Sequence, residues 1–133
     1  LQMSDRINHE ISTHVMLPAV GQGALGLEVR SDNTRVINLL KPLNHHHTHN
    51  CVAAERRVSK VLNGGCHSPI AVHADISGSI MQISAMVGSI DGKKIIKSRL
   101  SGPVSEGIEL GDKLGGDLIN KGANEILSAE TLS

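Results

Sequence analysis

The second half of the chain shows first a helical and then a strand-like alternation of hydrophobic and polar residues. Between about residues 48 and 62, the apolar residues share one arc of a helical wheel, which predicts an amphipathic helix. That arc comprises Cys51, Ala54, Val58, Val61 and Leu62. Residues 69–76 and 81–90 instead alternate at every second position, which is typical of strands. Asp91-Gly92 is a strong hairpin turn signal and predicts a third strand over residues 94–100, antiparallel to the second.

A last helix is predicted over about residues 105–128, with Pro103 near its start. Its apolar arc comprises Ile108, Leu114, Leu118, Ile119 and Ile126. Gly115 and Gly116 weaken this helix by about 1 kcal/mol each relative to alanine. The order α-β-β-β-α indicates an α+β fold in which two helices cover a three-stranded antiparallel sheet.

The first 43 residues carry a weaker pattern. A short helix is predicted over residues 4–12, with Ser4 as its N-cap. Residues 24–30 alternate and predict a strand, and residues 32–41 predict a helix that ends at Pro42.

The composition of the chain argues against several classes of function. The chain carries 13 basic and 13 acidic side chains, so no net charge points to nucleic-acid binding. No apolar run approaches the roughly 20 residues needed to cross a bilayer, so no membrane partner is expected. Two cysteines without paired spacing fit a reducing cytosol, and we expect a cytoplasmic protein. The chain has no Phe, Tyr or Trp and does not begin with Met, so we expect a C-terminal piece of a longer protein.

Cys66 is the most informative residue of the chain. It follows Gly64 and Gly65 on a predicted loop, where glycine lets the backbone take positive φ and approach a bulky group closely. An accessible thiol there can be a nucleophile or a covalent attachment point, and from position alone a small buried apolar residue is an equal alternative. Cys51 lies on the apolar arc of its helix and is expected to be buried and inert.

Other patterns have a plain structural interpretation beside a functional one. The histidine cluster of residues 45–49 suggests a transition-metal site, but adjacent side chains do not converge, so a solvated helix start is favoured and no metal is expected. Gly21, Gln22 and Gly23 could expose N–H groups to a phosphate, with a tight turn as the default. Arg30 could bind a carboxylate bidentately or form a surface ion pair. Glu55 and the arginine after it could be an ordinary helical pair.

Three motifs, in this order, resemble the C-terminal portion of the porphobilinogen deaminase family, also called hydroxymethylbilane synthase. Residues 17–30 (LPAVGQGALGLEVR) are similar to the family's glycine-rich active-site strand. Residues 43–46 (LNHH), followed by residues 54–56 (AER), match the start of its third domain. Residues 62–70 (LNGGCHSPI) match the loop that carries its cofactor. The resemblance spans nearly the whole chain.

The resemblance implies that the complete enzyme links four porphobilinogen molecules into hydroxymethylbilane and releases ammonia at each step. The growing polypyrrole starts on a dipyrromethane cofactor, held by a thioether to the loop cysteine, here Cys66, beside Gly64 and Gly65. Because this anchor stays fixed while the product grows, the two glycines are expected to act as hinges, and alanine at both is expected to leave the domain folded.

The resemblance also implies which residues bind carboxylates and to which domain of the enzyme each part of the chain belongs. Each pyrrole carries acetate and propionate, so Arg30 is implied to bind a carboxylate, with Gln22 and Gly23 in the pocket wall. Residues 1–16 would end domain 2, residues 17–43 would return to domain 1, and residues 44–133 would form the cofactor-carrying domain 3.

The family's catalytic aspartate belongs to an upstream segment, so no catalytic residue is expected in this chain. The chain alone is therefore expected to be inactive and to need the N-terminal remainder of an enzyme that is monomeric when complete. The alternative is a non-catalytic ligand-binding or interaction module of the same αβββα type. Such a module has no use for a modified thiol, so its mass would equal the mass of the sequence.

Overall fold

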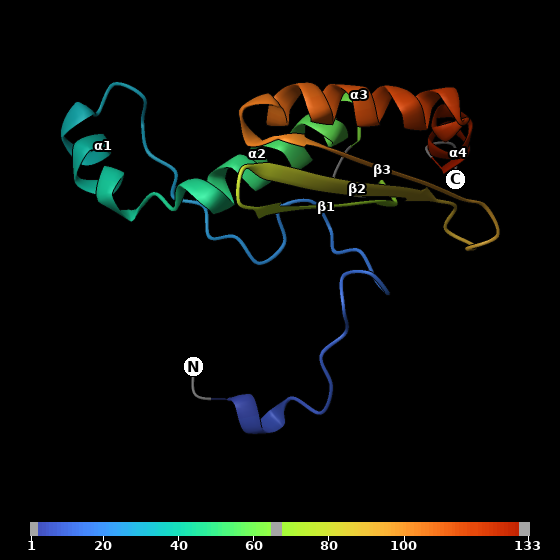
Figure 1. Ribbon diagram of the computed structural model, residues 1–133, viewed down its shortest axis with the longest axis horizontal. Helices are drawn as coiled ribbons and strands as arrows, with labels where there is room; N and C mark the ends of the chain where they lie inside the picture. The colour runs from blue at the N-terminus through green and yellow to red at the C-terminus, as the bar shows by residue number, and fades with distance from the viewer. Residues whose placement is uncertain (1–2, 65–67, 131–133) are drawn as a thin grey trace.

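An antiparallel sheet covered on one face by helices forms the body of the protein (Figure 1). The computed structural model describes residues 3–64 and 68–130. Strands β1 (Ile70–Ser77), β2 (Ile80–Gly88) and β3 (Ile95–Pro103) pair in sequence order. Helices α2 (His46–Val61) and α3 (Gly107–Asn120) lie side by side over the sheet. The predicted αβββα order and the three-stranded antiparallel sheet are therefore confirmed.

The core lies between this sheet and the two helices, and it is built from aliphatic residues and methionine. The predicted arc of α2 is confirmed, because Val58 and Leu62 are both buried. In α3 the arc is correct at Leu114 and Leu118 but wrong at Ile108, which is 46% exposed. Leu110, which is 4% exposed, faces the core in its place, because it lies four residues before Leu114 and therefore on the same side of α3.

Glycines let α3 approach α2 closely. Gly107, Gly111 and Gly115 recur every four residues, so they share one side of α3, and all three are buried. A Cβ at Gly111 would lie 2.8 Å from the Ala54 carbonyl oxygen, while a Cβ at Gly115 would lie 2.7 Å from the Cβ of Val61. Nothing lies within 4 Å of a Cβ at Gly116. The two adjacent glycines thus have different roles, although the sequence pattern treats them alike.

The predicted last helix is divided into two. Helix α3 ends at Asn120, and α4 (Ala123–Glu130) follows after a break at Lys121 and Gly122. Gly122 has a φ of +95°, a conformation that ends helices and that glycine adopts without steric cost. No helix in the described part of the chain is both long and apolar enough to cross a bilayer.

Apart from the stretch around Ala19, which pairs with β1, the segment before α2 extends away from the sheet (Figure 1). It contains the short helix α1 (Thr34–Leu40), capped by the side chain of Asn33, and single 3-10 turns at Ser4–Arg6 and Lys41–Leu43. The predicted helix over residues 4–12 is therefore mostly wrong, and the predicted strand over residues 24–30 is wrong. No neighbouring strand pairs with residues 24–30, and Leu25 is fully exposed, so the alternating pattern has nothing to pack against.

Candidate functional site

The loop predicted to carry the cofactor lies between α2 and β1. Gly65 and Cys66 fall outside the described residues, so their predicted roles stay predictions. On the near side, the N–H of Gly64 donates to the Ser59 carbonyl (2.9 Å) and the N–H of Asn63 donates to that of Lys60 (3.1 Å). These two bonds, with Asn63 at a φ of 52°, form a Schellman ending of α2. The described residues thus fix where the loop leaves the helix.

Gly64 is closely packed, and its expected role as a hinge stays a prediction. Its φ is not positive, because Asn63 takes the left-handed position before it. A Cβ on Gly64 would overlap Cδ1 of Ile70 and would lie 3.3 Å from Oγ of Ser59. The expectation that this glycine supplies positive φ is therefore wrong, and so is the assumption that the position lies clear of packed side chains.

Gly64→Ala is expected to destabilise the chain by about 1 kcal/mol, because Cδ1, the far end of the Ile70 side chain at the start of β1, must move aside. Gly26→Ala is the matched control, since nothing lies within 4 Å of a Cβ there and its φ is not positive. Urea unfolding of both variants measures the difference. Equal stability of the two variants would mean that Ile70 does not pack against this glycine.

Cys51 is buried, as predicted. Its side chain is on the inner face of α2, and the residue is 7% exposed. Burial raises the pKa of the Cys51 thiol to about 11, with the negative charges of Glu55 and Asp75 adding to the effect. The thiolate, which is the nucleophilic form, is therefore scarce at neutral pH.

The glycine-rich segment forms two successive turns. The N–H of Gln22 donates to the Ala19 carbonyl, and the N–H of Ala24 donates to that of Gly21. Gly21 (φ +68°) and Gly23 (φ +84°) each occupy the third position of one turn, where a left-handed residue is needed. The default interpretation as a tight turn is confirmed. Residues 18–24 are called the glycine turn below.

The glycine turn is attached to the outer edge of β1. Ala19 forms an antiparallel bridge with Ala71, and the N–H of Val72 donates to the Pro18 carbonyl (3.2 Å). Further along the same edge, Nε2 of His47 lies 3.2 Å from the carbonyl oxygen of Ile76. An edge strand presents unpaired backbone groups, and here other segments of the chain occupy them.

Glu55 joins this turn to the domain, and its role was missed by the sequence interpretation as a helical pair. One carboxylate oxygen, Oε2, accepts from the N–H of Gly21 (2.8 Å), and the other, Oε1, accepts from the N–H of Ala74 (2.8 Å). The residue is 5% exposed. Its position gives one signal: it lies four residues after Cys51 and three before Val58, on the buried side of α2. Because the Gly21 amide is occupied by this carboxylate, the alternative of a phosphate cradle loses a donor.

The remaining candidates have partners of their own. The guanidinium of Arg30 forms two bonds to Asp32, Nε to Oδ1 at 3.0 Å and Nη2 to Oδ2 at 2.5 Å, on the surface. The surface ion pair is therefore the state of Arg30 in this structure. The ring of His45 caps α2 by accepting from the N–H of Thr48. In residues 3–64 and 68–130, no three His, Cys, Asp or Glu side chains converge as metal ligands.

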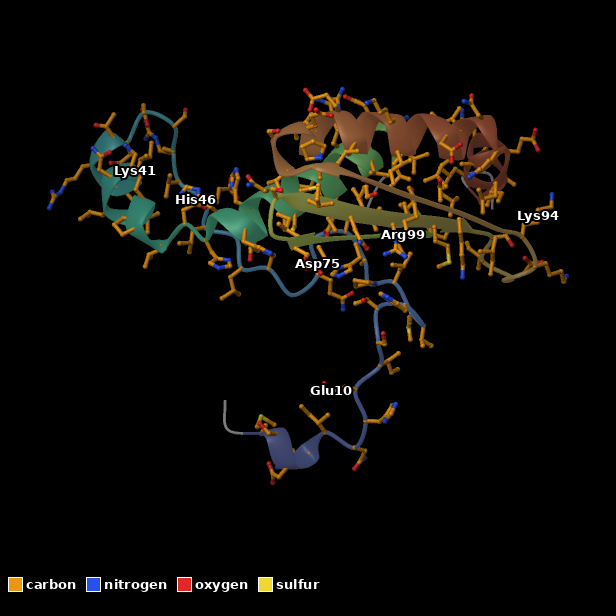
Figure 2. The ribbon with its side chains drawn as sticks, in the orientation of Figure 1. Glu10, Lys41, His46, Asp75, Lys94 and Arg99 are labelled. Carbon is orange, nitrogen blue, oxygen red and sulfur yellow. The ribbon has the colours of Figure 1, made fainter. Side chains whose placement is uncertain are left out.

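The face of the sheet opposite the helices is polar. Asp75 and Arg99 project from β1 and β3 on this face, and both are exposed (Figure 2). Gln82 on β2 lies across from Asp75 and accepts a bond from Arg99. The polar face and the glycine turn meet along β1.

Two family models match the chain. Residues 49–120 match the model described as "Porphobilinogen deaminase, C-terminal domain". Residues 1–38 match the model described as "Porphobilinogen deaminase, dipyromethane cofactor binding domain". The first match alone covers more than half of the chain, and it includes most of α2, the whole sheet and α3.

Proposed function

Because this chain belongs to the porphobilinogen deaminase family, we propose that it is part of the transferase that condenses four porphobilinogen molecules into hydroxymethylbilane. Each addition forms one carbon–carbon bond, and it breaks the carbon–nitrogen bond of the incoming aminomethyl group and the carbon–hydrogen bond of the pyrrole carbon that is joined. The nitrogen leaves as ammonia, and no oxidant or reductant is needed. Water supplies the hydroxyl group when the finished product leaves the cofactor. Family membership itself places the chain in tetrapyrrole biosynthesis.

The observation that carries this proposal is the burial of Cys51, which leaves Cys66 as the other cysteine of the chain. A thioether to a bulky dipyrromethane needs a thiol that the cofactor can reach, and Cys51 is buried with a raised pKa. Cys66 lies between Gly64 and Ser68, at the junction of α2 and β1, and the helix before it is closed off by the Schellman ending. The chemistry of the chain thus fits attachment at Cys66, with Gly64 and Gly65 next to it.

When bound, the dipyrromethane supplies the pyrrole ring to which the first substrate is added. The chain's own residues hold and orient the substrate and the cofactor. We propose that Arg30 exchanges its bond to Asp32 for a bidentate bond to a substrate or cofactor carboxylate. Gln22 and Gly23, in the glycine turn, form part of the pocket wall, and the side chain of Gln22 is itself held by accepting from the N–H of Ala19 (3.0 Å).

The N-terminal remainder of the enzyme is the proposed partner. Residues 3–43 expose many apolar side chains, which single-domain surfaces rarely gather in one segment. They are Met3, Ile7, Ile11, Val15, Met16, Leu25, Leu27, Leu39 and Leu43. We propose that these side chains pack against domains 1 and 2, that the catalytic aspartate lies there, and that the complete enzyme is a cytoplasmic monomer.

The test is to produce the chain together with that remainder, measure the intact mass, and follow the consumption of porphobilinogen. The expected result is a mass excess of two linked pyrrole units and release of ammonia. A mass equal to that of the sequence, with no consumption of porphobilinogen, would favour the non-catalytic binding module of the same fold.

Arg30→Lys in the complete enzyme is expected to lower turnover roughly 10- to 100-fold, because lysine keeps the charge but loses the two-pronged bond, and one bond to a charged group contributes about 1.5 to 3 kcal/mol. Stability should barely change, because the side chain is exposed. Arg35→Lys, the same change at an exposed position of α1, is the control. Unaltered kinetics in Arg30→Lys would leave Arg30 as a surface ion pair only.

A further inference from the structure

We propose that Glu55 is a positioning residue: its carboxylate holds the glycine turn against α2 and β1, the helix before and the strand after the loop that contains Cys66. It thereby fixes Gln22 relative to the ends of that loop. The expected effect of Glu55 on turnover rests on the proposed function. The contacts themselves do not depend on that function.

The geometry places one side chain at a three-way junction. Glu55 belongs to α2, the helix that ends just before the loop. Through Oε1 it contacts the N–H of Ala74 on β1, the strand that begins just after the loop. Through Oε2 it contacts the N–H of Gly21, the residue before Gln22. The helix before the loop, the strand after it and the turn beside them are thus tied together by one carboxylate.

The two hydrogen bonds that Glu55 accepts are of a strong type. A carboxylate that accepts from backbone N–H groups forms charge-assisted bonds, and these gain strength where water is excluded. Glu55 is almost fully buried, and Nδ1 of His73 lies 3.9 Å from Oε1, farther away than either amide nitrogen. The two amides are therefore the close partners of this charge.

The glycine turn is held by few other contacts with the domain. They include the Pro18–Val72 bond, the bridge of Ala19 to Ala71, and the packing of the half-buried Val20 against the core. The residues after the turn, 25–30, form no regular structure. Gly21 lies in the region matched by the cofactor-binding model, and Glu55 and Ala74 lie in the region matched by the C-terminal model. The carboxylate therefore links the two matched regions.

Glu55→Gln tests the contacts directly, because it keeps the shape and removes one acceptor. The glutamine NH₂ would face a backbone N–H that needs an acceptor, so one of the two bonds is lost. In the complete enzyme, amide hydrogen exchange at Gly21 or Ala74 is expected to become roughly 10- to 100-fold faster. Glu109→Gln, the same change at an exposed position of α3, is the control and should leave both amides unchanged. Unchanged exchange in Glu55→Gln would overturn the proposal.

A double-mutant cycle with Gln22→Ala separates positioning from mere stabilisation. Well below the unfolding temperature, Glu55→Gln is expected to lower kcat at least 10-fold, and to lower it less than about twofold when Gln22 is already alanine. Equal effects in the two backgrounds, or normal turnover despite faster exchange, would overturn the positioning role. Failure of the unmodified enzyme to consume porphobilinogen would instead overturn the proposed function, and the exchange result would still decide the contacts.

If Glu55→Gln does not fold, Glu55→Asp takes its place in both measurements. Aspartate keeps the charge but is one methylene shorter, so it cannot reach both amides. The same loss of protection and the same dependence on Gln22 are expected.

Discussion

Cys66→Ser is expected to abolish both the dipyrromethane adduct and the turnover of porphobilinogen in the enzyme completed by its N-terminal remainder. The cofactor is proposed to be held by a carbon–sulfur bond, and a serine hydroxyl is a far weaker nucleophile than a thiolate at neutral pH. Without the anchor the growing product has nothing to stay attached to. Intact mass reports the adduct, and ammonia release reports the turnover.

Cys51→Ala is the matched control for that experiment. It removes the chain's other thiol from a buried site on α2, so a modest loss of stability is expected with adduct and turnover retained. Digestion should map the extra mass of the unmodified enzyme to the peptide containing Cys66. Mapping of that mass to Cys51, or normal activity in Cys66→Ser, would contradict the proposed attachment.

The αβββα unit could be predicted from the sequence because its patterns and its partners lie in the same stretch of chain. The apolar arc of α2 and the alternating apolar residues of β2 each pack against a surface that is formed within residues 46–130. The alternation over residues 24–30 was equally regular and predicted a strand that does not form. A period of two indicates which side chains would share a face, but a strand also needs a neighbour for its backbone, and sequence pattern does not supply one.

The site was only partly predictable for a similar reason. The burial of Cys51 and the turn at residues 21–23 follow from local sequence, and both were predicted. The role of Glu55 depends on Gly21, 34 positions away, and on Ala74, 19 positions away. Only the folded chain brings these amides together. The close contact of Gly64 with Ile70 was hidden too, because a glycine in a loop motif indicates freedom as readily as it indicates tight packing.

The packing of α3 on α2 leads to the second large effect. Gly111→Ala is expected to destabilise the chain by about 3 kcal/mol, because the new methyl group would overlap the Ala54 carbonyl oxygen and the Cβ of Arg57, both 2.8 Å away. One neighbour is backbone, so relief requires α2 and α3 to move apart. That movement would also disturb the bond between Arg57 and Asp112 (2.6 Å), which joins the same two helices.

Gly116→Ala in the same helix is expected to have the opposite sign. Nothing lies within 4 Å of its Cβ, so the substitution adds helix propensity without a clash and should stabilise the chain by about 1 kcal/mol. Two glycine-to-alanine changes five residues apart should therefore differ by roughly 4 kcal/mol in the free energy of unfolding, measured in urea. Propensity alone predicts the same gain at both positions. Stabilisation by Gly111→Ala would mean that the helices do not approach as closely as their glycines indicate.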